Sequence, residues 1–208
     1  MILNFALCLL SAGGPADAPA SRLAVIRKAP DFALVNQDGK TVKLSDFGGR
    51  LVLVSFIFTT CNGTCPATTH RMAKIYEAIS VDQGYGGYGA YGQAIPAPVV
   101  FLSVTLDPQR DTTDALKKYA QLYDLQASAA LKKGRDKSWM LLTGSPEVVD
   151  KTLEIWGMWA KPGPSGQLDH PSRIFLLDQQ GRIREIYNVE MLRVQDVAAD
   201  LMELAKER

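Results

Sequence analysis

Short apolar runs alternate along the chain with stretches that have the periodicity of an amphipathic helix. Residues 51–58 (LVLVSFIF) and 98–106 are continuous apolar runs rich in β-branched and aromatic side chains, which is typical of strands buried on both faces. Residues 66–80 instead place apolar side chains three and four positions apart, which predicts a helix. The same criteria predict strands over 139–142, 172–177 and 183–187, and helices over 111–125, 146–156 and 194–206.

Two pairs of short runs flank turn-forming residues and predict antiparallel hairpins. Residues 32–35 and 40–44 lie on either side of the tetrapeptide NQDG, and the last two predicted strands lie on either side of DQQG. Because strands and helices alternate, we predict an α/β fold with a central mixed sheet flanked by helices and an N-terminal hairpin. The parallel units should have right-handed crossovers. Asp111 is the predicted N-cap of the helix over 111–125.

Two segments do not fit this alternation. Residues 1–20 combine a short apolar run with small residues and the tripeptide Ala16-Asp17-Ala18, which is typical of a signal peptide or a disordered leader and favours export. Residues 82–93 (DQGYGGYGAYGQ) contain too much glycine for a helix or a strand, so we expect a surface loop inserted between two elements. The predicted domain therefore covers residues 29–208.

Composition narrows the classes of protein without indicating a chemistry. The chain has 208 residues, of which 47% are hydrophobic and 22% charged, as in soluble globular proteins. The net charge of +1 provides no basic surface for nucleic acid and no polybasic segment for anionic membranes. Three cysteines are too few for a disulfide scaffold, and no apolar stretch is long enough to span a membrane.

The candidate chemistry begins with Cys61 and Cys65, which lie between the predicted strand 51–58 and the helix 66–80. Ligands bind at the carboxyl ends of strands in open α/β sheets, and the helix dipole lowers the pKa of a thiol at a helix N-terminus. Two cysteines four positions apart around a first helical turn can converge on one point. They can form a disulfide, attack one, or bind a soft metal ion.

The two histidines are predicted to play different roles. His70 is five residues past Cys65, about 140° around the helix from it, and should face solvent. His170 ends the Pro/Gly-rich segment KPGPSGQLDH immediately before a predicted strand, where a loop on a rigid scaffold often carries function. Its neighbour Asp169 is placed to orient the imidazole.

Two thiolates and one imidazole form a soft set of three ligands that suits Cu(I) and, with an added ligand, Cu(II). A structural zinc site would need a fourth protein ligand, and no further cysteine or histidine is free near these elements. Two alternatives remain. The cysteine pair can be the redox pair of a thiol–disulfide oxidoreductase, or it can be a purely structural pair.

Five segments then occur in a specific order: 39–47 (GKTVKLSDF), 58–66 (FTTCNGTCP), 106–112 (LDPQRDT), 142–144 (LTG) and 169–170 (DH). In this order they resemble motifs of the Sco/SenC family, the copper-binding, thioredoxin-like proteins of cytochrome c oxidase assembly. The most specific match is to the family's F-T-x-C-x-x-x-C-P motif. The resemblance covers nearly the whole predicted domain.

The resemblance implies a thioredoxin-like copper metallochaperone. Cys61, Cys65 and His170 would bind copper, as Cu(I) or Cu(II), and Asp107 and Asp111 would support the site. Family members deliver copper to, or reduce the thiols of, the dinuclear copper site of an oxidase subunit. The expected partner is therefore a copper-accepting oxidase subunit or another copper protein. The alternative remains a thiol–disulfide oxidoreductase that reduces the cysteines of a copper protein.

The resemblance also implies work outside the cytoplasm, in the periplasm or on the outer face of the inner membrane, with any membrane association through an N-terminal anchor. The chain departs from the family pattern at two places near the site. Asn62-Gly63 stands where the family usually has a proline-containing interval, and Pro171 stands where it often has serine. Pro171 restricts the backbone of His170 to extended conformations, but neither change removes a ligand.

Overall fold

The structure, a computed structural model, describes residues 22–79, 95, 97–123, 139–163 and 167–207. The predicted leader (residues 1–20) and the predicted loop insertion (residues 82–93) lie outside the described residues. Within the described part, no helix combines the length and the apolar character that a membrane span requires.

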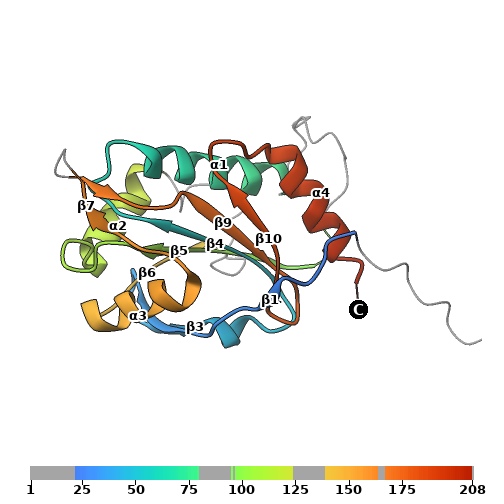
Figure 1. Cartoon of the computed structure of the whole chain (residues 1–208), viewed down its shortest axis with the longest axis horizontal. Coiled ribbons are helices and arrows are strands. Elements are labelled where there is room, and N and C mark those ends of the chain that lie inside the picture. Colours follow the sequence, from blue (N-terminus) through green and yellow to red (C-terminus); the bar gives the residue numbers. More distant parts are fainter. Residues whose placement is uncertain (1–21, 80–94, 96, 124–138, 164–166, 208) are drawn as a thin grey trace, which may run out of the picture.

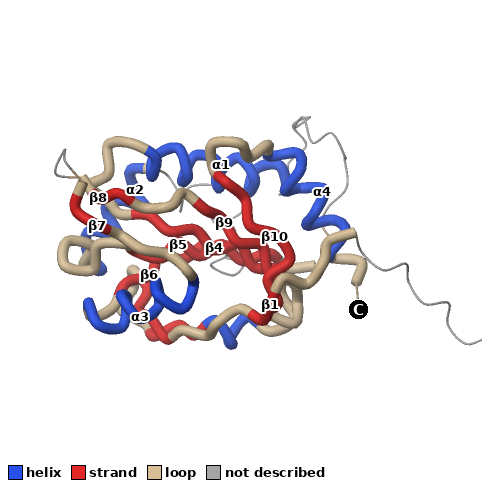
Figure 2. Tube along the Cα trace, in the orientation of Figure 1, coloured by secondary structure: helices blue, strands red, loops and turns tan. Residues whose placement is uncertain are grey.

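The strands are β1 (Arg27–Lys28), β2 (Ala33–Asn36), β3 (Thr41–Lys43), β4 (Leu51–Ile57), β5 (Val99–Thr105), β6 (Trp139–Thr143), β7 (Lys161–Pro162), β8 (Leu168–Asp169), β9 (Arg173–Leu177) and β10 (Arg182–Asn188). The helices are α1 (Thr64–Ile79), α2 (Thr113–Leu122), α3 (Pro146–Trp156) and α4 (Val194–Leu204), with a short 3₁₀ helix over Leu44–Phe47. Figure 1 labels these elements, and Figure 2 separates helices from strands by colour.

The described strands form one eight-stranded mixed sheet with the order β1-β10-β9-β4-β5-β6-β2-β3, and a separate two-stranded sheet of β7 and β8. In the large sheet β4 pairs in parallel with β5 and antiparallel with β9, and β5 pairs in parallel with β6. All seven residues of β4 are buried, as expected for a central strand covered on both faces. The apolar run of residues 51–58 thus forms the middle of the core.

Helices cover both faces of the sheet. The helices α1 and α4 lie side by side above the sheet in Figure 1, and α3 lies below it. On the α3 side an aromatic cluster fills the core, with the Trp156 ring 5.8 Å from that of Phe56 and 5.1 Å from that of Phe175. Both neighbours meet the indole with tilted or edge-on rings, the arrangement that aromatic pairs prefer. This aromatic layer packs through Phe56 on β4, the strand that leads to the cysteines.

The predicted elements are confirmed for the central strands, all four helices and both hairpins, with boundary differences of a few residues at most element ends. The prediction that Asp111 caps α2 is wrong. Thr112 is the N-cap, its side chain accepting from the N–H of Ala115. The strands β7 and β8 were not predicted, because strands of two residues flanked by glycine and proline have no apolar periodicity.

Candidate metal centre

The two cysteines lie at the carboxyl end of β4, where the chain turns into α1. Cys61 belongs to the connecting loop and is half-buried, whereas Cys65 is the second residue of α1 and is fully buried. Both are free thiols. The Sγ atom of Cys61 accepts hydrogen bonds from the backbone N–H groups of Gly63 and Cys65, each at 3.4 Å. A backbone N–H of the loop and one of the first turn of α1 therefore point at the more accessible sulfur.

The buried sulfur has a different environment. Cys65 Sγ accepts a hydrogen bond from the backbone N–H of Phe58 at 3.4 Å. Burial nevertheless raises the pKa of the Cys65 thiol far above its ordinary value, and the Phe58 hydrogen bond only partly offsets this. For Cys65 the expected lowering of the thiol pKa is therefore wrong, because desolvation by burial is the largest influence on it.

His170 follows β8 and brings its imidazole to the buried cysteine. Its Nε2 atom lies 3.7 Å from Cys65 Sγ, and its Nδ1 lies 3.0 Å from the carbonyl oxygen of Pro171. Because a carbonyl only accepts, Nδ1 carries the hydrogen in the neutral ring, and Nε2 offers its lone pair toward the sulfur. The Phe58 ring meets the imidazole edge-on, with the ring centroids 5.7 Å apart. These contacts fix the orientation that metal coordination needs.

The structure thus brings together Cys61, Cys65 and His170, whose ligand atoms all lie within 4.8 Å of one another. Bond lengths of about 2.3 Å to sulfur and about 2.0 Å to nitrogen, as in zinc sites, would place sulfur and nitrogen about 3.7 Å apart in trigonal geometry. The separation of Cys65 Sγ and His170 Nε2 is 3.7 Å. The three residues therefore fit a three-coordinate soft metal ion such as Cu(I).

Two other predicted residues are not part of this cluster. His70 is exposed on α1, as predicted. Asp169 is exposed as well and packs beside Gly163, where a Cβ atom would lie 2.7 Å from its Oδ1 atom. The hydrogen bond of Nδ1 goes to the Pro171 carbonyl, and a role of Asp169 in orienting the imidazole stays a prediction.

Asp111 has a supporting role that the sequence did not define. It is fully buried, and its carboxylate accepts from the backbone N–H of Thr59 at 3.2 Å, from the Thr59 hydroxyl at 2.5 Å and from the Thr105 hydroxyl at 2.6 Å. Burial raises the pKa of Asp111, with these hydrogen bonds acting against it. Thr59 is two residues before Cys61, so Asp111 anchors the start of the cysteine loop to the end of β5.

Asp107 lies between β5 and α2 and makes its contacts within that connection. Its N–H donates to the Thr105 hydroxyl at 2.9 Å, and its carboxylate pairs with Arg110. Neither this carboxylate nor that of Asp111 belongs to the group of ligand atoms described above. Asp111 therefore acts on the site through Thr59, and the supporting role that the resemblance implies for Asp107 stays a prediction.

The sequence profile of a family described as SCO1/SenC matches residues 22–206. The chain belongs to the SCO1/SenC family. The SCO1 protein homolog of Bacillus subtilis is 28% identical over 174 residues, which cover 82% of this chain and 79% of that protein. The mitochondrial SCO2 homolog of Bos taurus is 26% identical over 76% of this chain. The chain spans only about half of that relative (53%), so the activity of the longer protein does not transfer as a whole.

Solved structures of Sco proteins share the fold. A SCO1/SenC family lipoprotein of Bacillus anthracis is 26% identical, with a TM-score of 0.71 over 90% of this chain and 100% of that one. BsSco, described with a disulfide switch and as a member of the Sco family of cytochrome c oxidase assembly proteins, is 26% identical with a TM-score of 0.68 over 89% of this chain and 98% of that one. Bradyrhizobium japonicum ScoI with copper bound has a TM-score of 0.63 at 24% identity, over 85% of this chain and 99% of that one. These similarities confirm the predicted thioredoxin-like fold.

Proposed function

We propose that this protein binds one copper ion through Cys61, Cys65 and His170 and delivers it to a copper-accepting subunit of a cytochrome c oxidase or to another copper protein. The observation that carries the proposal is the convergence of two thiols and one imidazole within 4.8 Å. Soft sulfur ligands with one imidazole select copper over hard cations. Relatives named as Sco proteins with copper bound support the same choice of metal.

The three ligands contribute differently to copper binding and transfer. His170 presents the Nε2 lone pair because Nδ1 donates to the Pro171 carbonyl. Cys65 must lose its proton when it binds the metal, since burial keeps the free thiol protonated. Cys61 is the more accessible sulfur and is the ligand that an incoming donor of the copper-accepting protein can replace first.

The name of BsSco supports cytochrome c oxidase assembly as the process that uses the copper. The apolar run and the Ala16-Asp17-Ala18 tripeptide support work on the exported side, in the periplasm or at the outer face of the inner membrane. An N-terminal anchor would be the route to the membrane, since net charge provides no polybasic surface.

Copper binding by the reduced protein tests this function, with wild type compared with His170→Ala and with His70→Ala as the matched control. We expect one copper per chain in wild type. Removal of His170 should weaken binding by at least the roughly 10- to 100-fold that follows loss of a supporting partner. It should also change the thiolate-to-Cu(II) absorption bands, whereas His70→Ala should leave stoichiometry and bands unchanged. Equal copper affinity in His170→Ala and wild type would contradict the assignment.

A second function is favoured by the two free thiols. In that case the Cys61 thiolate attacks a disulfide of a copper protein and forms a mixed disulfide, with one client sulfur leaving as a thiol. The Cys65 thiolate then attacks Cys61, releasing the second client thiol and leaving a Cys61–Cys65 disulfide, so that two electrons and two protons pass to the client. The disulfide switch described for BsSco supports this alternative. Reduction of a client disulfide at equal rates by wild type and His170→Ala would favour it over copper delivery.

A further inference from the structure

The hairpin that carries His170 does not belong to the large sheet. Among the strands that the structure describes, β7 and β8 pair only with each other, through Lys161 with Asp169 and Pro162 with Leu168. The N–H of Gly163 donates to the Gln167 carbonyl at 2.7 Å and closes the hairpin. Because a two-stranded hairpin is only marginally stable by itself, its position depends on contacts with the rest of the domain.

One such contact reaches the cysteine loop. The backbone N–H of Asn62 donates to the side-chain Oε1 of Gln167 at 3.2 Å, across 105 positions of the sequence. Among the described residues it is the sole hydrogen bond between the loop of residues 59–64 and the hairpin of residues 161–169. Asn62 directly follows Cys61, and Gln167 precedes His170 by three positions. The bond therefore joins the two segments that carry the metal ligands without using any ligand atom.

We propose that this hydrogen bond, the Asn62–Gln167 latch, holds His170 within reach of the two cysteines before copper arrives, which makes Gln167 a positioning residue for the copper site. The inference rests on the proposed function and extends it. A ligand held in its bound position pays less ordering entropy when the metal binds. The latch should therefore raise copper affinity and slow copper release.

The chain provides a matched pair of variants for the donor of the latch. Asn62→Pro removes the N–H, and Asn62→Ala changes the same side chain while keeping the N–H, so it is the reference. Gln167→Met removes the acceptor at nearly the same volume. We expect Asn62→Pro, relative to Asn62→Ala, and Gln167→Met, relative to wild type, each to weaken Cu(I) binding by about 2- to 10-fold, the range of one net hydrogen bond.

The double variant distinguishes loss of the latch from a distortion of the cysteine loop by proline. In the Gln167→Met background, Asn62→Pro and Asn62→Ala should bind copper equally, because the acceptor is already missing. The metal-free protein offers an independent measurement by NMR: the Asn62 amide should exchange with solvent faster in Gln167→Met than in wild type, and residues 167–170 should move more on the nanosecond timescale.

Two results would overturn the latch. One is equal copper affinity of Asn62→Pro and Asn62→Ala in the wild-type background together with unchanged exchange of the Asn62 amide in Gln167→Met. The other is an effect of Asn62→Pro that is as large in Gln167→Met as in wild type. Failure of the proposed function has a different outcome, since wild type itself would then retain no copper while the amide exchange still reports on the latch.

Discussion

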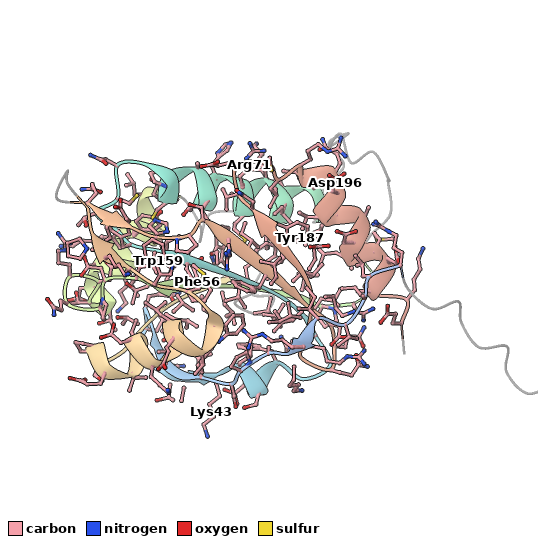
Figure 3. All side chains as sticks on the ribbon, in the orientation of Figure 1. Lys43, Phe56, Arg71, Trp159, Tyr187 and Asp196 are labelled. Atoms are coloured by element: carbon pink, nitrogen blue, oxygen red, sulfur yellow. The ribbon has the colours of Figure 1, made fainter. Side chains whose placement is uncertain are left out.

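At the α4 end of the sheet the buried guanidinium of Arg184 is held by two carboxylates and a backbone carbonyl, whereas at the metal end the two sulfur atoms accept hydrogen bonds from neutral backbone N–H groups. Arg184 is buried, and its guanidinium donates to Asp178 at 3.0 Å, to Glu207 at 2.8 Å and to the Leu23 carbonyl at 3.1 Å. At the metal end the sulfur atoms accept bonds of 3.4 Å and the hairpin is latched at 3.2 Å. Trp159 lies toward the metal end and Asp196 toward the α4 end (Figure 3).

The α4 end therefore contributes to the stability of the fold, whereas the metal end leaves its ligand atoms available to a metal ion. Charge-assisted hydrogen bonds fully satisfy Arg184, which joins the first and last described segments of the chain to the sheet. At the metal end the two sulfur atoms accept from neutral N–H groups and Nε2 of His170 keeps its lone pair, so these atoms stay available to a metal ion. The two ends should therefore respond independently to substitution. Two substitutions test this independence, and a pH dependence tests the ion pairs of the α4 end.

The largest expected effect is on stability, from Arg184→Met. It removes the cation and leaves Asp178 and the Leu23 carbonyl without this partner, and breaking a buried ion network costs about 3–5 kcal/mol. Urea unfolding of the metal-free protein should show that loss, while the copper affinity of the folded variant stays at the wild-type value. A fall in copper affinity would show that the two ends are coupled.

A smaller loss of stability, with an effect on copper, is expected from Asp111→Ala. The substitution leaves the half-buried donors of Thr59 and the buried hydroxyl of Thr105 without this acceptor, which costs about 2–3 kcal/mol. Because Thr59 leads into the cysteine loop, copper binding should weaken as well, in contrast to Arg184→Met. The exposed Asp114 is the control, and Asp114→Ala should change neither quantity by more than the ~1 kcal/mol of a helix-dipole contact. Unchanged copper affinity in Asp111→Ala would contradict the role of Asp111 in anchoring the cysteine loop.

The smallest expected effect is a pH dependence that belongs to the α4 end. Burial acts to raise the pKa of Asp178, but hydrogen bonds from Arg182 and Arg184 outweigh it and hold this pKa below its ordinary value of 3.8. A carboxylate with a lowered folded-state pKa stabilises the fold above its unfolded pKa, and this contribution is lost as the pH falls through the folded value. The stability difference between wild type and Asp178→Asn should thus be constant near pH 7 and shrink below about pH 4. Urea midpoints between pH 7 and pH 3 measure it, and a difference that does not change with pH would contradict the assignment.

The sequence predicted those strands and helices in which apolar side chains recur at a regular spacing along the chain. The run of residues 51–58 and the helical spacing of residues 66–80 were sufficient to place β4, α1 and the two cysteines between them. His170 was placed by its loop and by the family resemblance, because nothing local links it to residues 105 positions away.

The parts that the sequence could not provide depend on tertiary contacts. Asp111 is a good N-cap residue by type, yet Thr112 takes that position because the Asp111 carboxylate is the acceptor for buried hydroxyl groups of other elements. Gln167 carries no sequence signal at all, since its role depends on one backbone N–H of a distant loop. Likewise, the helix start at Cys65 predicted a lowered thiol pKa, whereas burial, which no local pattern reveals, raises it.

Both described ends of the chain lie beside α4, away from the start of α1 where the cysteines lie. Arg22 binds Glu203 through its backbone N–H, and Glu207 binds Arg184, so the first and last described residues meet beside α4. The strand β9 begins at Arg173, close after His170, and ends at Leu177, toward α4 (Figure 1). The metal site and the described ends of the chain therefore lie at opposite ends of this strand. A domain attached to a surface by either end would consequently turn its sulfur atoms outward, toward the solution from which a docking protein arrives.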